Sequence, residues 1–208
     1  MELMRRDRRM EKGGRMLMEE ALCASFSDGR DMHVFKAVNG VCVAVMSRYG
    51  TVVYAGAYKN EKPAVDLIYR MASEKNLVLR SDEDVVARYG CERDVCVVSC
   101  KVFDSRRVVY VAAHALDGGV DVHVFDGRLE ALLCAACAAL GCTRADAIVV
   151  GDDVFCLREE GGACSLRCAV GALRKSGDRS RRIETVCDGV PVADALSDMW
   201  ATANGGRA

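Results

Sequence analysis

The first third of the chain alternates between apolar and polar positions, which is the pattern of half-buried β-strands. Residues 33–38 and 41–46 alternate in this way and flank Asn39-Gly40, the dipeptide that most strongly favours a two-residue hairpin turn. A third segment of this kind, residues 51–57, follows a turn at residues 48–50. The sequence therefore predicts an N-terminal β-hairpin followed by another strand.

After residue 60 the spacing of apolar residues changes. Pro63 suits the first turn of a helix, and apolar residues follow it at helical spacing. Residues 94–101 are apolar almost throughout, which is typical of a buried parallel strand. Residues 106–116 contain valines that favour a strand, but their length and the glycines at 118–119 favour a helix.

Strands and helices are expected to alternate along the rest of the chain. The expected strands are residues 77–79, 94–101, 120–125, 147–150, 154–157 and 183–186. The expected helices are residues 63–72, 106–116, 129–140, 165–175 and 192–202. This order favours an α/β fold with a mostly parallel sheet flanked by helices. No internal sequence repeat is evident.

The same pattern divides the chain into three parts. Residues 1–31 are charged and rich in methionine, and we expect a mobile charged arm. Residues 32–142 are expected to form the α/β domain with its leading hairpin, and residues 143–208 a small α+β C-terminal extension.

Composition limits the classes of function that need consideration. The chain has 208 residues, of which 51% are hydrophobic and 28% are charged, so it can form a real core and is too short for a large multi-domain machine. Its net charge of −1 gives no whole-protein attraction for nucleic acid or membrane. The charge-free stretch at 131–142 is too short to cross a bilayer, and we expect no membrane contact.

Twelve cysteines are present, and their spacing favours packing over metal binding. Cys134 and Cys137 lie inside an apolar helix, and Cys164 and Cys168 are one helical turn apart. The absence of an apolar segment behind the basic N-terminus favours a reducing compartment, in which cysteine behaves as a small hydrophobic residue. We therefore expect no metal and no cofactor, and a zinc-stabilised regulatory module built on the C-terminal cysteines is the alternative.

Two basic clusters are weak candidates for contact with nucleic acid or for nuclear import, and a solvated surface is the simpler interpretation of both. They are Arg5, Arg6, Arg8 and Arg9, and then Arg174, Lys175, Arg179, Arg181 and Arg182. Arginines outnumber lysines by twenty-two to seven, which is typical of a GC-rich genome.

Residues 51–140 resemble the catalytic domain of the serine recombinases, the resolvases and invertases. Residues 52–59 precede the helix at Pro63, where that family has a strand ending in Gly-Tyr-x-Arg-x-Ser. Residues 94–98 run into 101–107, where the family has a strand ending in Asp-Arg-Leu-x-Arg, and residues 118–124 complete the match. The resemblance implies a resolvase-like parallel sheet.

The resemblance also implies that the recombinase chemistry is lost. Recombination requires a serine nucleophile and arginines that neutralise the phosphate in the transition state. Tyr58 stands at the serine position and Gly56 at an arginine position, and Asp104, Arg106 and Arg107 are offset from the second motif. These are degenerate positions, and we expect a protein that is not an enzyme. An active DNA strand-cleaving enzyme that uses Tyr58 or Ser105 (the residue between Asp104 and Arg106) is the alternative.

Similar inactive recombinase-like proteins occur in large DNA viruses, poxviruses in particular. The resemblance therefore implies a viral protein of the host cell cytoplasm, or of the nucleus or nucleolus. It would act by self-association or by binding a viral or host protein, with DNA as an unproven further partner. In the family a helix after the core sheet forms the dimer, and the expected counterpart is residues 129–140, with Leu132, Leu133, Ala136 and Leu140.

Overall fold

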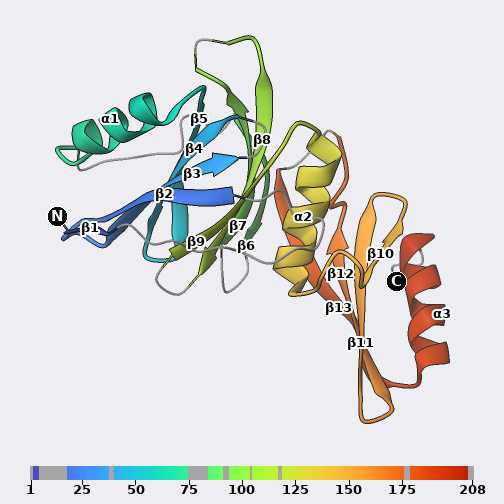
Figure 1. The fold of residues 1–208 in the computed structure, drawn as a ribbon. Helices are drawn as coiled ribbons and strands as arrows, with labels where there is room; N and C mark the ends of the chain where they lie inside the picture. Colours follow the sequence, from blue (N-terminus) through green and yellow to red (C-terminus); the bar gives the residue numbers. More distant parts are fainter. Residues whose placement is uncertain are drawn as a thin grey trace.

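The computed structural model describes residues 2–4, 18–37, 40–74, 84–90, 94–103, 105–116, 119–175 and 179–205. Over these residues the chain forms two β-sheets and three α-helices (Figure 1). The strands are β1 (Glu2–Met4), β2 (Met18–Ser25), β3 (Arg30–Ala37), β4 (Cys42–Arg48), β5 (Thr51–Tyr58), β6 (Val85–Gly90), β7 (Asp94–Lys101), β8 (Val108–Leu116), β9 (Gly119–Phe125), β10 (Ala147–Val150), β11 (Asp153–Glu160), β12 (Ala163–Val170) and β13 (Ser180–Val190). The helices are α1 (Glu61–Met71), α2 (Arg128–Leu140) and α3 (Val192–Ala203).

The first sheet is antiparallel, with the strand order β1-β2-β3-β4-β5. The hairpin expected around Asn39-Gly40 is confirmed as β3 and β4, in which Phe35 pairs with Val43. The strand expected at 51–57 is β5, which pairs with β4. Helix α1 covers one face of this sheet through the buried side chains of Ala64, Ile68 and Met71, which recur at helical spacing.

The second sheet has eight strands in the order β10-β11-β12-β13-β6-β7-β8-β9. Every neighbouring pair in it is antiparallel except β13 and β6. The expected α/β fold with a mostly parallel, resolvase-like sheet is therefore wrong, because the described chain is mostly β and antiparallel. Residues 151–152 alone join β10 to β11, and residues 161–162 alone join β11 to β12. Two-residue connections of this kind are possible between antiparallel neighbours and not between parallel ones.

Two expected helices are strands. Residues 106–116 contain β8, in which β-branched Val109 and Val111 are buried and pair with β7. Residues 165–175 contain most of β12 and the turn after it. Cys164, Leu166 and Cys168 are all buried on that strand, so the two cysteines are related by a strand period of two rather than by one helical turn.

The element order repeats three times along the chain. Strands β2–β5 are followed by α1, strands β6–β9 by α2, and strands β10–β13 by α3. In each case the four strands follow one another as an antiparallel meander, and the helix packs on strands of its own meander. We refer to these ββββα segments as unit 1 (18–71), unit 2 (85–140) and unit 3 (147–203). Repetition is thus present in the structure although none is evident in the sequence.

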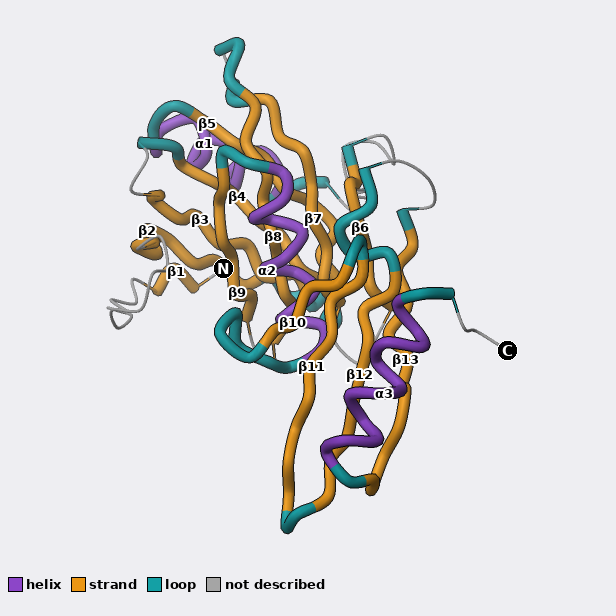
Figure 2. Tube along the Cα trace, turned by 90° about the vertical axis from the view of Figure 1, so that its right-hand side faces the viewer, coloured by secondary structure: helices purple, strands orange, loops and turns teal. Residues whose placement is uncertain are grey.

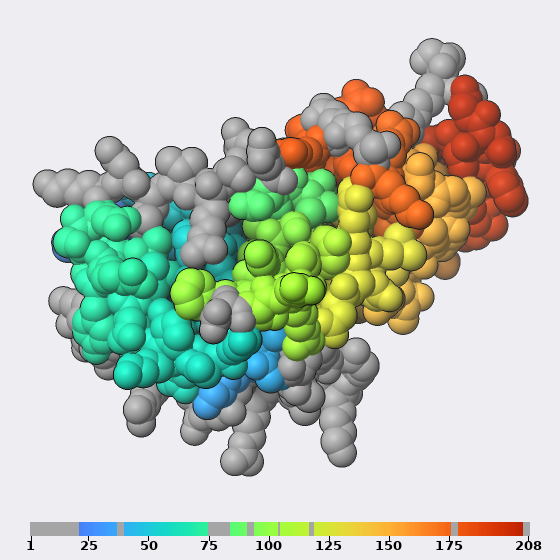
Figure 3. All heavy atoms as spheres, turned by 90° about the horizontal axis from the view of Figure 1, so that it is seen from above, coloured from blue at the N-terminus to red at the C-terminus, as the bar shows by residue number. Residues whose placement is uncertain are grey.

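The units pack in two different ways. The first sheet and strands β6–β9 form a sandwich whose core includes Val43, Val45, Val98 and Val111. Units 2 and 3 share the second sheet through β13 and β6, and α2 lies between strands β7–β9 of its own unit and strands β11 and β12 of unit 3 (Figure 1). Seen from above, the molecule is elongated, with α1 near one end and α3 at the other (Figure 3).

Helix α3 covers the face of β11–β13 opposite to α2, through Ala195 and Met199. Viewed along the direction that looks onto unit 3, α3 lies across β12 and β13 with no other described helix or strand in front of it (Figure 2). None of the helices in the described segments is long and apolar enough to span a membrane.

Candidate functional site

The described positions among those carried over from the recombinase resemblance do not share one pocket. Tyr58 is 4% exposed, and its hydroxyl hydrogen-bonds to the hydroxyl of Tyr54 at 2.8 Å in the core under α1. Gly56 lies between the two tyrosines on β5, and a Cβ there would be 2.5 Å from the Tyr54 hydroxyl. Gly56 therefore allows the two tyrosines to pair, and Tyr58 has the environment of a structural residue.

The two arginines of the second motif are on the surface. Arg107 pairs with Asp126, with its Nη2 2.7 Å from the carboxylate, and both side chains are well exposed. Ser105 Oγ accepts a hydrogen bond from the Arg107 backbone N–H at 2.9 Å. Arg106 is also exposed, and Asp104 lies outside the described residues. The described geometry gives each of these groups a local partner or solvent rather than a common substrate.

The basic clusters are only partly described. Arg5, Arg6, Arg8 and Arg9 lie outside the described residues. In the second cluster, Arg174, Lys175, Arg179 and Arg182 are exposed, while Arg181 is 8% exposed and donates to the carbonyl of Arg174. Arg182 pairs instead with Glu184, so the structure divides the cluster between different surroundings.

A function of the arginines that the sequence did not indicate is to bind backbone groups of a neighbouring unit. Arg88 on β6 donates to the carbonyl of Val52 at 2.8 Å, and Asp94 on β7 accepts from the N–H of Val52 at 2.9 Å. Arg88 and Asp94 also pair with each other at 3.0 Å. This Arg88–Asp94 clamp satisfies both backbone groups of a residue on the open side of β5, as another strand would.

Arginines also bind the C-terminal ends of two helices. Helix α2 has no basic residue in its last turn, but Arg158 on β11 donates to the carbonyl of Gly141 and Arg167 on β12 to that of Leu140 at 3.4 Å. Arg30 on β3 donates to the carbonyls of Met71 and Glu74 at the end of α1. Positive charge at this end of a helix is favourable because the unpaired carbonyls there carry partial negative charge.

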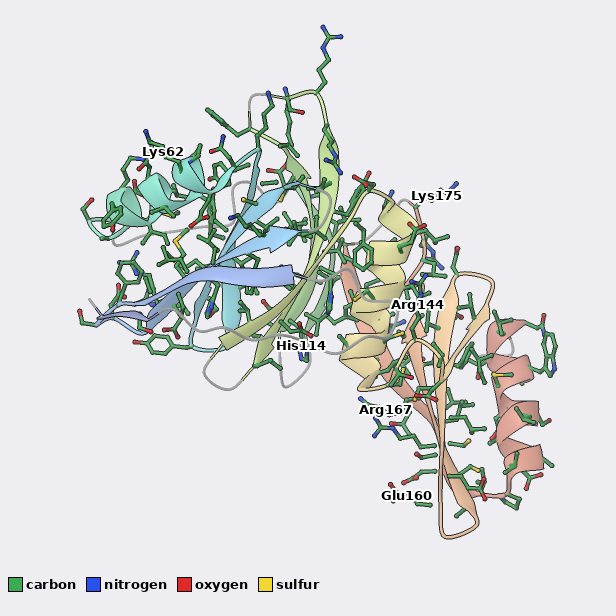
Figure 4. All side chains as sticks on the ribbon, in the orientation of Figure 1. Lys62, His114, Arg144, Glu160, Arg167 and Lys175 are labelled. Carbon is green, nitrogen blue, oxygen red and sulfur yellow. The ribbon has the colours of Figure 1, made fainter. Side chains whose placement is uncertain are left out.

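Figure 4 shows that basic side chains lie near both ends of α2. Arg144 and Arg167 are close to its C-terminal end, and Lys175 is close to its N-terminal end. At the N-terminal end Arg128 donates to the carbonyl of Arg174. These arginines therefore connect α2 to the loops and strands of unit 3.

The described cysteines are free thiols, and many are buried on strands and helices as expected. No group of three or more His, Cys, Asp or Glu side chains is arranged to hold a metal ion in the part of the chain that the structure describes. Burial raises the pKa of the Cys96 thiol to about 12. One group is different: Cys137, Cys142 and Cys156 meet at the C-terminal end of α2, where the Cys142 thiol hydrogen-bonds to those of Cys137 and Cys156.

The segment expected to form a dimer helix is enclosed by the chain itself. Leu132, Ala136 and Leu140 of α2 are at most 1% exposed, and they belong to a core that includes residues of unit 3. Leu133 is partly buried against the same core. The described helix that instead presents large apolar side chains to solvent in regular succession is α3.

On α3, Val192, Leu196 and Trp200 are 38%, 40% and 58% exposed. They are four residues apart and therefore form one stripe along the helix, which we call the α3 stripe. Trp200 is the only tryptophan of the chain. Comparison with family models, with curated proteins and with solved structures finds no match to this chain.

Proposed function

We propose that the protein is a non-catalytic, self-associating protein and that the α3 stripe is the surface through which two copies bind. The observation that carries the proposal is the exposure of Val192, Leu196 and Trp200 side by side on one helix. Single exposed apolar residues are ordinary, but a contiguous apolar patch is typical of an interaction surface. Tryptophan in particular is enriched among the residues that dominate binding energy.

The repeated architecture supports this proposal, because the equivalent positions of α2 are covered. Counted from the residue that precedes each helix, Leu196 and Trp200 of α3 correspond to Leu132 and Ala136 of α2. The two α2 residues are 1% and 0% exposed. Helix α2 is covered on a second side by β11 and β12 of the next unit, whereas α3 packs on β11–β13 of its own unit among the described elements. The α3 stripe thus lacks the covering layer that α2 has.

A second copy is suited to this surface because the stripe is uncharged. At 100° per residue, Asp194 and Asp198 fall on the side of α3 opposite to the stripe. Asp198 is close to Cys187 of β13, where its carboxylate contributes to raising the pKa of that thiol, after burial as the largest cause. Two α3 stripes can therefore meet without placing carboxylates against each other.

The size of the stripe predicts a weak dimer. Its three side chains expose roughly 300 Å² of apolar surface, so two copies would bury about 600 Å². At about 25 cal/mol per Å² this gives about 15 kcal/mol before the cost of association, which is about 4–15 kcal/mol. A stable interface buries about 1,200 Å² or more, so the stripe alone corresponds to the transient class. We expect reversible dimerisation in the micromolar range.

Sedimentation velocity over a range of concentrations tests the proposal. The wild-type protein should pass from monomer to dimer, and Leu196→Asp should stay monomeric because it places an unpaired charge in the interface. Ala201→Asp is the matched control: it adds the same charge to an exposed position on the other side of α3 and should dimerise like wild type. Trp200 fluorescence should shift to the blue as the dimer forms.

A wild-type protein that is monomeric at every concentration overturns the proposal. It is also overturned if Leu196→Asp dimerises as well as Ala201→Asp does, because the dimer would then use another surface. Circular dichroism of both variants shows whether each has kept its fold.

A further inference from the structure

Three cysteines, from unit 2, unit 3 and the segment between them, meet where α2 ends. Cys137 is in the last part of α2, Cys142 is just after the helix, and Cys156 is on β11 of unit 3. Cys137 and Cys156 are 5% and 2% exposed, whereas Cys142 is only partly buried. We call these residues the α2 thiol cluster.

The backbone at the end of α2 places Cys142 against Cys137. Gly141 is left-handed with φ 70°, and its N–H donates to the carbonyl of Ala138 at 3.1 Å. The N–H of Cys142 donates to the carbonyl of Cys137 at 2.9 Å. This pair of bonds is the Schellman motif, in which the side chains at the positions of Cys137 and Cys142 characteristically touch. The structure follows this rule, since the two thiols hydrogen-bond to each other.

The same end of the helix is fixed by the neighbouring unit. Arg158 on β11 and Arg167 on β12 donate to the carbonyls of Gly141 and Leu140, respectively. The turn that brings the two sulfur atoms together is therefore held from outside as well as by its own hydrogen bonds.

The two thiols differ in acidity, which divides their roles. The hydrogen bond from Cys142, with help from the charge of Arg144, lowers the pKa of Cys137. The same hydrogen bond is the largest cause that raises the pKa of Cys142. Cys137 is thus the more acidic of the two thiols and the one that more readily forms the thiolate, the form that reacts with oxidants, and Cys142 is the thiol beside it.

We propose that Cys137 and Cys142 are an oxidation site at which a hydroperoxide produces an intramolecular disulfide. The Cys137 thiolate attacks one oxygen of hydrogen peroxide, the O–O bond breaks, and sulfenic acid and hydroxide form. The sulfur of Cys142 then attacks the sulfur of Cys137, the S–O bond breaks, and the proton of Cys142 leaves with the hydroxyl group as water. Both sulfur atoms are oxidised by one electron each, and the peroxide is reduced to hydroxide and water.

The disulfide would join the last turn of α2 to the residue after its cap. It would covalently fix the turn at the junction between units 2 and 3, which in the reduced protein is held by hydrogen bonds. Cys156 would be left as a reduced thiol beside it.

Peptide mapping of the full-length protein tests the proposal. The folded protein is treated with hydrogen peroxide, the remaining thiols are alkylated, and the protein is cleaved with trypsin. Cleavage after Arg128 and Arg144 places Cys134, Cys137 and Cys142 on one peptide, and Cys156 is on the next. The expected product is a first peptide that has lost two hydrogens and carries one alkyl group, and a second peptide that is fully alkylated.

Two variants identify the pair within that peptide. Cys142→Ser should abolish the disulfide and leave Cys137 as a sulfenic acid that dimedone traps. Cys134→Ser, the matched control on the same peptide, should form the disulfide at the wild-type rate and then carry no alkyl group on the first peptide. Prior unfolding in urea should remove the preference for this pairing.

Three results would overturn the proposal. One is full alkylation of all three cysteines after peroxide treatment of the folded protein. The second is a cross-link between the two peptides, which would place the disulfide at Cys156. The third is loss of the disulfide in Cys134→Ser but not in Cys142→Ser, which would assign it to Cys134 and Cys137.

Discussion

Replacing Asp94 with alanine removes half of the Arg88–Asp94 clamp, and we expect it to destabilise the protein by about 3 kcal/mol. Val52 is 0% exposed, and its N–H donates to the Asp94 carboxylate, which is itself only 12% exposed. A hydrogen bond to a charged acceptor contributes about 1.5–3 kcal/mol, and the buried N–H would have no water to replace it. The ion pair with Arg88 adds less than about 1 kcal/mol, because that arginine is 36% exposed.

Urea denaturation measures this loss. With an m-value of about 2 kcal/mol/M, the midpoint of Asp94→Ala should fall by about 1.5 M. Asp94→Asn keeps an acceptor for the Val52 N–H and should lose about half as much. Asp126→Ala is the matched control, because it removes an aspartate from an ion pair in which the side chains of Arg107 and Asp126 are 39% and 64% exposed. Asp126→Ala should lower the free energy of unfolding by less than about 1 kcal/mol.

The transition is followed by circular dichroism and by the fluorescence of Trp200, which reports on unit 3. If the clamp joins units 1 and 2, Asp94→Ala should shift the transition seen by circular dichroism at least as much as that seen by fluorescence. Equal losses for Asp94→Ala and Asp126→Ala would refute the reasoning, because the captured backbone N–H would then contribute nothing measurable.

Three further substitutions test other parts of the structure by the same denaturation experiment. Gly56→Ala should cost about 1–3 kcal/mol because its Cβ would be 2.5 Å from the Tyr54 hydroxyl, whereas Gly90→Ala, with open space around it, should cost less than about 1 kcal/mol. Arg30→Lys should cost about 2–3 kcal/mol, since Arg30 is 4% exposed and one ammonium group cannot replace its several directed hydrogen bonds; wild-type stability would contradict this. Burial raises the pKa of the Cys96 thiol from 9.0 to about 12. The stability that the buried neutral thiol contributes is therefore complete below pH 9 and is lost as the pH rises towards 12. Over this range the free energy of unfolding of Cys96→Ala should therefore fall less steeply with pH than that of wild type. The two slopes should differ by up to about 1.4 kcal/mol per pH unit, and equal slopes would exclude the effect.

Local signals in the sequence are sufficient to predict an element where only one periodicity fits its residues. Asn39-Gly40 lies between two alternating segments, and the hairpin forms there as β3 and β4. Its register differs by one residue, because Phe35 pairs with Val43 and a two-residue turn at 39–40 would pair it with Ala44. Residues 129–140 are apolar on nearly all sides, and α2 is buried between two layers as such a helix must be. The bounds of β7 also agree with the prediction, but its apolar character does not come from a parallel sheet. It is buried on both faces because the first sheet packs on one side and α2 on the other.

The errors arose where two periods fit the same residues. Cys164 and Cys168 are four apart, which suits one turn of a helix and also two periods of a strand. The buried Leu166 between them decides for the strand, but burial is set by α3 and is not visible in the sequence. Ala112 and Ala113 favour a helix by propensity, and the cross-strand partners of β8 override that preference. These two changes replace helices with strands and convert the expected alternation into antiparallel meanders.

The candidate site was harder to predict because its partners are distant or are backbone atoms. The α3 helix was predicted, but its apolar residues form two stripes, and the sequence alone does not say which one faces β11–β13. The α2 thiol cluster needs Cys156, which reaches Cys142 only because unit 3 packs against α2. Arg88, Arg158 and Arg167 bind backbone carbonyls, and a carbonyl is present at every residue, so no side-chain motif marks the acceptor.

The excess of arginine over lysine, which is typical of a GC-rich genome, also has a structural role. Arg88 joins unit 2 to unit 1, and Arg158 and Arg167 join unit 3 to the end of α2. Guanidinium groups suit these positions because each has five donors in a fixed plane and can bind a carbonyl while it contacts a second group. Since each acceptor is a backbone atom, the junctions depend on the arginine and on the local backbone rather than on the acceptor's side chain. Three copies of one element order can therefore be joined without any recurring sequence motif, which accounts for a repeat that is present in the structure and not evident in the sequence.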